Sequence, residues 1–381
     1  MEGRVRIGIY YKWDKSWMGG FYYIQNLLVS LNFLNDEEKP MIDFYCREFD
    51  IFEKMSKFSS YPYLIYNEVK ESFLYRGIKK FIRYINEDLA YRIPTIKFRK
   101  DDLFVYPYEM STNIPCVSWK PDFQEKYLPE YFSKKEVKYR DFSIIYSSKH
   151  NVPIVFSSFD SLNDYKKFYP HFNNKIFVLH FGVNIPDFSN VRIEELYKRY
   201  EISSPYLLCA NQFWKHKNHL FLFRAFKKAL DAGLKMQLIC TGAFSDYRNT
   251  QYIKDIKDYI KTFHLENKIK FLGLIEKTEL LCLMSNSYAI VQPSLFEGWN
   301  TTVEECKALN KFVFLSNINV HKEQMSQNVC FFDPHNESDL VEKLLHVSPI
   351  VKPCDYSTSM KDFGKSFMAI IRYMKQDNLA I

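Results

Sequence analysis

Two glutamates, Glu297 and Glu305, are the residues of this sequence best suited to recognising a ligand by its hydroxyl groups. They follow the short apolar run 288–292, and Gly298 stands directly after the first of them. A carboxylate is costly to remove from water unless donors replace that water, so it suits a ligand that brings its own hydroxyl donors. The spacing predicts Glu297 in a loop and Glu305 in the next helix, each binding a different hydroxyl-bearing ring.

The helix that carries Glu305 is predicted to begin at Asn300 or Thr301, because either side chain can cap it. Amides at a helix start lack acceptors within the helix and lie at the positive end of its dipole. The amides of Asn300, Thr301 and Thr302 are therefore predicted to face the phosphates, and Gly298 and Trp299 are included among the predicted donor-binding residues. A competing interpretation is that Glu304 and Glu305 only stabilise the helix start, by ~0.3–1 kcal/mol. It fits Glu304 better than Glu305.

Lys217 is the predicted diphosphate ligand. It follows the apolar run 206–210 and stands just before a predicted helix, in a loop that also holds Asn211 and Gln212. A lysine at such a junction combines a point charge with free amides, which is a common way to hold phosphates. The alternative for this loop is a solvated basic turn without a ligand.

Two adjacent glycines, Gly19 and Gly20, stand at the first predicted strand-to-helix junction, after the run 5–11. Without side chains they allow backbone N–H groups to approach a phosphate closely. We therefore include both glycines among the predicted binding residues. No complete Gly-x-Gly-x-x-Gly pattern is present, so a simple turn stays open as the alternative.

The elements that position these loops alternate between short apolar runs and segments with helical periodicity along the whole chain. This alternation predicts an α/β fold in which parallel sheets are covered by helices on both faces. The pattern restarts after the turn-rich stretch 182–190. We predict two Rossmann-like, doubly wound domains, 1–185 and 186–355, that face each other across a cleft. A final helix within 356–381 is expected to pack back on the N-terminal domain.

Composition narrows the classes of partner. The chain has 381 residues, a formal charge of +7, 28 tyrosines and 34 phenylalanines, which favours an anionic small ligand or an acidic lipid surface. No nucleic-acid-binding module is recognisable, so we expect no nucleic-acid partner. The eight cysteines form no C-x-x-C pair and the nine histidines show no metal-ligand spacing, so we expect no bound metal or other cofactor.

Together, these loops resemble the family-4 (group 1) retaining glycosyltransferases of the GT-B fold. Glu297 and Glu305 match the family's Glu-x7-Glu signature, Lys217 with Asn218 its donor-phosphate segment, and Gly19 with Gly20 its N-terminal glycine loop. The similarity extends from Arg4 to about Pro334. It includes the segments 121–124, 128–132, 157–158, 181–183 and 316–323.

The resemblance implies a nucleotide sugar, linked to UDP, GDP or dTDP, in domain 186–355 and an acceptor in domain 1–185. It assigns the ribose hydroxyls to Glu305, the donor sugar to Glu297 and the diphosphate to Lys217. Gly242, Leu274 and Ile275 would line the base. The family transfers sugars with retained anomeric configuration, usually without metal, and cationic and amide groups stabilise the leaving diphosphate.

The sequence departs from the family pattern at two positions. Gln212 stands where many members carry an arginine, and Lys215 or His216 could replace the missing charge. Pro121 stands where many members have a histidine before the acceptor-side aspartate, here Asp122. We still predict Glu297, Lys217 and Asp122 as catalytic. The departures keep open a catalytically silent nucleotide-sugar-binding subunit, whereas the absent glycine pattern argues against an epimerase or dehydrogenase.

A basic and aromatic stretch in the N-terminal half suggests where the protein acts. On a helix these residues would mix cationic and aromatic faces, which favours docking on an anionic membrane surface, or would simply pack against the sheet. The stretch comprises Lys70, Phe73, Tyr75, Arg76, Lys79, Lys80, Phe81, Arg83 and Tyr84. We expect a cytoplasmic hexosyl- or deoxyhexosyltransferase at the inner membrane face, adding to a glycan or lipid-linked oligosaccharide in surface-polysaccharide (lipopolysaccharide or capsule) assembly.

Overall fold

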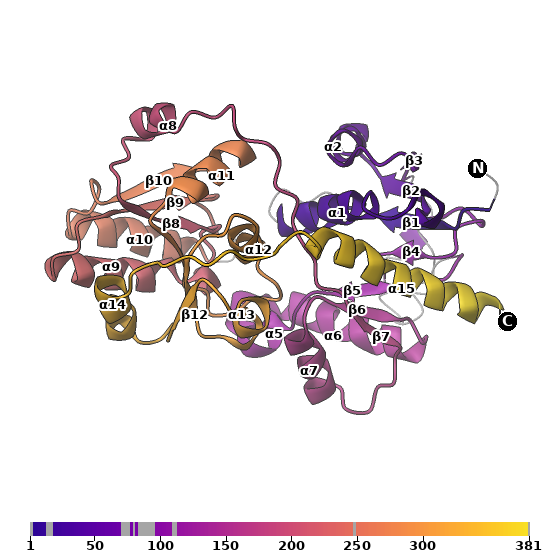
Figure 1. The fold of residues 1–381 in the computed structure, drawn as a ribbon. Helices are drawn as coiled ribbons and strands as arrows, with labels where there is room; N and C mark the ends of the chain where they lie inside the picture. Colours follow the sequence, from indigo (N-terminus) through magenta and orange to yellow (C-terminus); the bar gives the residue numbers. More distant parts are fainter. Residues whose placement is uncertain are drawn as a thin grey trace. The chain divides into compact units, whose positions relative to one another are not determined.

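A computed structural model describes residues 3–12, 18–69, 77–78, 81–82, 96–108, 113–246 and 249–379 (Figure 1). The chain forms two compact units. Unit 1 comprises Met1–Phe123, Ser133–Asn184 and Ser357–Ile381, and unit 2 comprises Gln124–Phe132 and Ile185–Tyr356. The chain therefore passes between the units within one residue of the predicted boundaries 185/186 and 355/356.

One short segment was assigned to the wrong domain from the sequence. Residues 124–132, predicted within domain 1–185, belong to unit 2. Aromatic contacts hold them there: the Tyr127 and Phe296 ring centres lie 5.5 Å apart, and Lys215 Nζ lies 5.2 Å from the Tyr131 ring centre. No local pattern in the segment predicts these contacts, because the partner residues lie more than eighty positions away.

The strands of unit 1 form a parallel, doubly wound arrangement. One sheet has the order β3-β2-β1-β4 and the other β5-β6-β7. Val105 in β4 donates its N–H to Pro115 O and accepts from Val117 N–H, which joins β4 to the residues before β5. The strands are β1 (Arg6–Tyr10), β2 (Met41–Cys46), β3 (Leu64–Glu68), β4 (Val105–Tyr106), β5 (Ser118–Lys120), β6 (Ile154–Phe156) and β7 (Ile176–Val178).

The C-terminal helix of the chain closes unit 1. Helix α15 (Ser359–Leu379) lies along α1 (Met18–Leu31), as Figure 1 shows in yellow and indigo. Gly364 makes this approach possible, because a Cβ there would lie 2.6 Å from Ser30 O. The other helical segments of unit 1 are η1 (Asp36–Glu38), α2 (Phe49–Ser59), α6 (Lys134–Lys149) and α7 (Phe159–Phe168).

Unit 2 contains one parallel sheet in the order β10-β9-β8-β11-β12-β13. The winding direction reverses between β8 and β11, and in such sheets ligands bind beyond the carboxyl ends of the strands at this switch point. The strands are β8 (Tyr206–Ala210), β9 (Gln237–Thr241), β10 (Ile269–Gly273), β11 (Ala289–Gln292), β12 (Val313–Ser316) and β13 (Val329–Phe332).

Helices cover both faces of this sheet, so the central strands are apolar throughout. Leu207 and Cys209 of β8 enter the core beneath α9, α10 and α14, whereas Tyr206 and Leu208 enter the core beneath α8, α11 and α12. The helical segments are α5 (Gln124–Tyr127), η2 (Pro129–Tyr131), α8 (Ile193–Tyr200), η3 (Lys215–Lys217), α9 (His219–Asp231), α10 (Thr250–Thr262), α11 (Lys277–Asn286), α12 (Thr301–Ala308), α13 (Asn319–Gln324) and α14 (Glu337–His346). Within the part of the chain that the structure describes, no helix has both the length and the apolar character needed to span a bilayer.

Candidate active site

The loops after β8 and β11 meet at the switch point of unit 2 and bring Lys217 to Glu297. Lys217 Nζ lies 2.6 Å from Glu297 Oε1, and the two side chains are 16% and 8% exposed. The loops are also joined through their backbones, because Leu295 N–H donates to His216 O. Two residues eighty positions apart in the sequence therefore form one charged pair.

Glu297 uses only one of its two oxygens in contacts with the protein. Oε1 accepts from Lys217 Nζ and, at 3.2 Å, from Asn300 Nδ2. Oε2 has no hydrogen-bond partner among the residues described. This oxygen can therefore accept a hydrogen bond from a ligand.

Helix α12 begins beside this pair. Asn300 is its cap, because Asn300 Oδ1 accepts from Val303 N–H at 3.2 Å, so Thr301 is the first helical residue. Thr302 Oγ1 donates to Ala210 O at the end of β8. Trp299, Thr301 and Thr302 are half-buried, whereas Gly298 and Asn300 are buried. The helix start thus lies at the switch point, with the first amides directed out of the helix.

Glu305 lies on α12, and it also keeps one oxygen without a partner. Its Oε1 forms an ion pair with Lys277 Nζ, at the first residue of α11, and its side chain is 4% exposed. Its Oε2 has no hydrogen-bond partner within the described ranges. Lys277 was missed in the sequence reading, because nothing in the segment Glu276–Thr278 marks it as part of a site.

Glu304 differs from both, since its two oxygens are occupied. Oε1 accepts from Lys307 Nζ at 3.0 Å and from Gln324 Nε2 at 2.9 Å, and Oε2 accepts from Tyr356 OH at 2.8 Å. Glu304 stands in the first turn of α12 and is 2% exposed, so its contacts go beyond stabilising the helix start. It is a buried structural carboxylate that links α12 to α13 and to the end of unit 2.

The carboxyl ends of β9 and β10 complete this edge of the sheet. Gly242, with φ of 127°, follows β9, and a Cβ there would lie 2.2 Å from Asn211 O. Asn211 Nδ2 donates to Gln292 Oε1 at 2.5 Å, which ties the end of β8 to that of β11. Beyond β10, Leu274 is 72% exposed and Ile275 is half-buried.

That Lys215 or His216 replaces the charge missing at Gln212 stays a prediction. Gln212 is half-buried, Lys215 Nζ lies over the Tyr131 ring, and His216 is buried. The second ammonium group that contacts a predicted site residue is that of Lys277.

A neutral histidine lies behind the loop that carries Glu297. His321 Nδ1 is 3.0 Å from Ser316 O, and Ser316 Oγ donates to Ser294 O at 2.6 Å. Burial lowers the pKa of His321 to about 4, so the ring is uncharged at neutral pH. It therefore supports the loop without adding positive charge.

The remaining predicted residues lie in unit 1. Asp122 Oδ1 is 3.8 Å from Arg140 Nη1, after β5. Gly19 and Gly20, predicted at the junction before the helix, lie in the first turn of α1, which begins at Met18. Residues 13–17 are outside the described ranges, and so are Lys70, Phe73, Tyr75, Arg76, Lys79, Lys80, Arg83 and Tyr84 of the basic and aromatic stretch.

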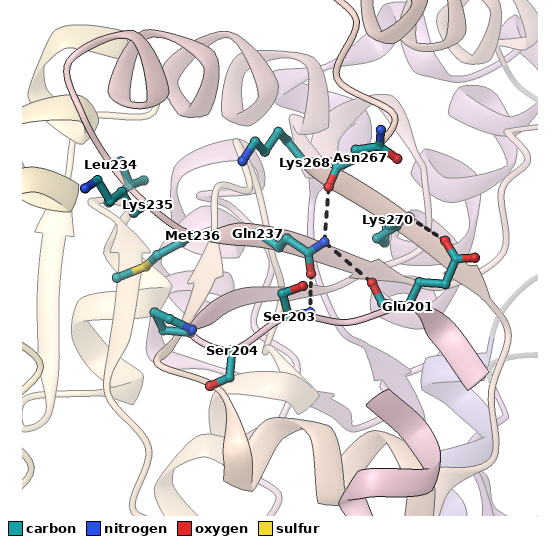
Figure 2. Close-up of a pocket in the computed structure, with 11 residues that line it drawn as sticks. Glu201, Ser203, Ser204, Leu234, Lys235, Met236, Gln237, Asn267, Lys268 and Lys270 are labelled. Carbon is teal, nitrogen blue, oxygen red and sulfur yellow. Dashed lines mark hydrogen bonds and ion pairs between the residues drawn. The ribbon is translucent and has the colours of Figure 1, made fainter. Parts of the chain in front are cut away.

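A pocket of about 620 Å³ lies at the opposite edge of the unit 2 sheet, where β8, β9 and β10 begin (Figure 2). Its polar groups bond to one another: Gln237 accepts from Ser203 N–H and donates to Asn267 O, and Lys270 pairs with Glu201 (Figure 2). Ligands of parallel sheets bind at the carboxyl ends of the strands, so we do not assign the site to this pocket.

Among the described residues, no group of three or more His, Cys, Asp or Glu side chains could hold a metal ion.

Comparisons with known proteins agree with this geometry. Residues 193–348 match the family described as glycosyl transferases group 1. The O-antigen chain mannosyltransferase RfbU of Salmonella typhimurium is 27% identical over 217 residues, which are 57% of this chain and 56% of that protein. The chain thus aligns with little more than half the length of this relative.

Solved structures share the fold over nearly the whole chain. A glycosyltransferase from Rickettsia africae has a TM-score of 0.60 and 17% identity, covering 99% of this chain and 94% of that one. Anabaena HepE in complex with UDP and glucose has a TM-score of 0.63 and 12% identity, covering 99% of both chains. These similarities show the GT-B fold.

Proposed function

Because residues 193–348 match the family described as glycosyl transferases group 1, we propose that this chain transfers a hexose or deoxyhexose from a nucleotide sugar with retention of anomeric configuration. The proposed acceptor is a glycan or a lipid-linked oligosaccharide in surface-polysaccharide assembly. The name of the Salmonella relative, an O-antigen chain mannosyltransferase, supports this setting and makes a mannosyl donor the first to test.

One observation supports the donor site above all others. Glu297 and Glu305 are nearly buried, each has one oxygen paired with a lysine, and each leaves the other oxygen without a partner in the described structure. A buried carboxylate with one unpaired oxygen suits a ligand that supplies hydroxyl donors to that oxygen. In our proposal the donor sugar binds Glu297 and the ribose binds Glu305.

The diphosphate then lies between Lys217 and the start of α12. Lys217 Nζ carries three N–H donors, and Glu297 is its one hydrogen-bond partner among the described residues. The first amides of α12, at Thr301 and Thr302, lack helical acceptors. As the bond from the anomeric carbon to the diphosphate oxygen breaks, the electron pair stays on the diphosphate, where these donors stabilise the growing charge. The acceptor hydroxyl oxygen bonds to the same face of that carbon, and its proton passes to the departing diphosphate oxygen. Asp122 is the proposed acceptor-side residue.

The donor can be identified by thermal denaturation in the presence of UDP-, GDP- and dTDP-linked sugars, because a ligand that binds only the folded state raises the melting temperature. Stabilisation by at least one of them, followed by transfer to a glycan or lipid-linked acceptor, is the expected result. No stabilisation by any would contradict the proposal. Binding without transfer or hydrolysis would favour the silent subunit suggested by Gln212 and Pro121.

Replacing either Lys217 or Glu305 with alanine should remove most transfer activity. We expect turnover to fall by roughly 10²–10³-fold, the usual effect of losing one donor to a developing anion or one ligand contact of similar strength. Lys254→Ala, at an exposed position on α10, is the control and should leave turnover unchanged. Near-wild-type turnover in both site variants, measured on folded protein, would refute the assignment.

We also propose a cytoplasmic location with peripheral contact to the inner membrane face. The basic and aromatic stretch within 70–84 motivates this part, and flotation with anionic liposomes tests it. Failure to float would remove the membrane contact and leave the transfer reaction untouched.

A further inference from the structure

Lys277 is the residue of the site that neither the motif nor the local sequence indicates. It is the first residue of α11, in the loop region after β10, and its side chain is 24% exposed. We propose that Lys277 is a positioning residue of the donor site: it holds Glu305 Oε1 so that Oε2 faces the ribose hydroxyls of the donor nucleotide. This inference rests on the proposed function, since it assigns a partner to one of its binding residues.

The same arrangement occurs twice at this edge of the sheet. Lys217, from the loop after β8, binds Oε1 of Glu297, and Lys277, from the loop after β10, binds Oε1 of Glu305. In both pairs the glutamate is nearly buried and its Oε2 is without a partner in the described ranges. Two glutamates in one segment are therefore each oriented by a lysine from a different loop.

Glu304 shows what a purely structural carboxylate looks like in the same helix. It is equally buried and also paired with a lysine, Lys307, but Gln324 and Tyr356 occupy its remaining acceptor positions. A carboxylate whose role is structural thus has both oxygens satisfied by the protein. In Glu305 only Oε1 is paired by the protein, which indicates that a ligand supplies the hydrogen-bond donors to Oε2.

The ion pair also has a physical role in ligand binding. A nearly buried carboxylate with no partner would be strongly destabilised, and it would turn toward any available donor. Lys277 offsets this cost and restricts the rotation of the Glu305 side chain, so fewer orientations are lost when the ribose binds. The donor nucleotide therefore meets a carboxylate that is already oriented.

A structural role in holding α11 in place is the main competing explanation. However, α11 is held by Leu281 and Leu283, which are fully buried in the core, whereas Lys277 is at the helix start. Lys277→Met leaves the nearly buried Glu305 carboxylate without this ion pair, so we expect that variant to remain folded with a lowered melting temperature. Lys277→Arg keeps the charge and should melt close to the wild type.

The test compares Lys277→Met, which keeps the apolar stem but removes the charge, with Lys277→Arg, which keeps the charge. Titration calorimetry measures their affinity for UDP or GDP, whichever stabilises the wild type, and for the matching 2′-deoxynucleoside diphosphate. We expect Lys277→Met to weaken ribonucleotide binding about tenfold, as for a hydrogen bond to a charged group, and deoxynucleotide binding clearly less. Lys277→Arg should restore ribonucleotide affinity to within about threefold of the wild type.

The control is Lys307→Met, because Lys307 is also paired with a glutamate of α12 and its side chain is 23% exposed. This variant should change ribonucleotide affinity less than twofold. A second control is the double variant Glu305→Gln with Lys277→Met, in which the loss should be no larger than in Glu305→Gln alone, because coupled residues are not additive.

The outcomes separate the two proposals. Suppose that the wild type binds UDP or GDP. The positioning role is then overturned, and the donor site stands, if Lys277→Met binds both nucleotides as tightly as the wild type does. The same conclusion follows if the substitution lowers the affinities for the ribonucleotide and the deoxynucleotide equally. If neither nucleotide nor any nucleotide sugar binds the wild type, the proposed function fails, and the role of Lys277 fails with it.

Discussion

Single buried polar residues give the two units opposite responses to pH. In unit 1, burial raises the pKa of Asp102 to about 7, with Asp43 beside it adding to the effect, while Tyr45 OH donates to its Oδ2. In unit 2, burial lowers the pKa of His321 to about 4. Both groups are uncharged in the folded protein under conditions where the unfolded chain would charge them.

The sign of each contribution follows from proton linkage. Folded Asp102 keeps its proton up to about pH 7, whereas the unfolded residue releases it near 3.8, so its stabilising contribution is present below pH 4 and is lost as pH rises toward 7. Folded His321 stays neutral down to about pH 4, whereas the unfolded residue protonates near 6.5, so stability is lost as pH falls from 6.5 to 4.

Asp102→Asn should therefore stabilise unit 1 more at pH 8 than at pH 5. The amide keeps the oxygen that accepts from Tyr45 but cannot ionise. Each pH unit between 5 and 7 contributes at most about 1.4 kcal/mol, so we expect a difference of roughly 1–2 kcal/mol between the two pH values. Chemical denaturation at both values measures it. An equal effect at pH 5 and pH 8 would contradict the assignment of a raised pKa.

At the scale of elements, Gln324 fixes the start of α12. Its side chain accepts from Asn300 N–H at 3.1 Å and donates to Asn300 O at 2.7 Å and to Glu304 Oε1 at 2.9 Å. Helices as short as α12 and α13 have little stability of their own, so contacts between elements decide where they lie. The first amides of α12 are thus held at the switch point by a residue of α13.

Gln324→Leu should lower both stability and nucleotide affinity. It leaves buried polar groups of Asn300 without partners, which costs about 1–3 kcal/mol of unfolding free energy, and it loosens the helix start that faces the phosphates. Denaturation and UDP or GDP titration measure the two effects. Gln251→Leu, at an exposed position on α10, is the matched control. If Gln324→Leu is destabilised but its nucleotide affinity is unchanged, Gln324 contributes to folding and not to nucleotide binding.

At the scale of the whole molecule, the last helix returns the chain to unit 1. Helix α15 buries one face against that unit and approaches α1 most closely at Gly364. The residues buried on this face are Met360, Phe363, Phe367, Ile370, Ile371 and Met374. A perturbation of this contact should therefore remain within unit 1.

Gly364→Ala tests this independence. The added Cβ would lie 2.6 Å from Ser30 O, so the helices must separate, and we expect a loss of roughly 1–3 kcal/mol. Hydrogen exchange should accelerate in α1 and α15 but not in the sheet of unit 2. Ser366→Ala, at an exposed position on the same helix, is the control. Faster exchange throughout unit 2 would show that the units do not respond separately.

Much of this arrangement could be predicted from the sequence, because the patterns that predict it are local. The run 206–210 is β8, the run 288–292 contains β11, and the helix predicted to begin at Asn300 or Thr301 is α12, which begins at Thr301. A strand buried on both faces is apolar throughout, and a cap followed by helical periodicity marks a helix start. The alternation of such elements was sufficient to predict doubly wound parallel sheets and the loops that carry Lys217, Glu297 and Glu305.

The partners of these residues depend on the tertiary structure alone. Lys277 lies 28 positions from Glu305, Gln324 lies 24 positions from Asn300, and residues 124–132 belong to a unit formed mainly by 185–356. Hydrophobic periodicity indicates which side of each element is buried, whereas the pairing of Lys217 and Lys277 with glutamates of the segment after β11 depends on the strand order β10-β9-β8-β11. That order brings together loops that are distant in the sequence, and it thereby decides which lysine orients which glutamate.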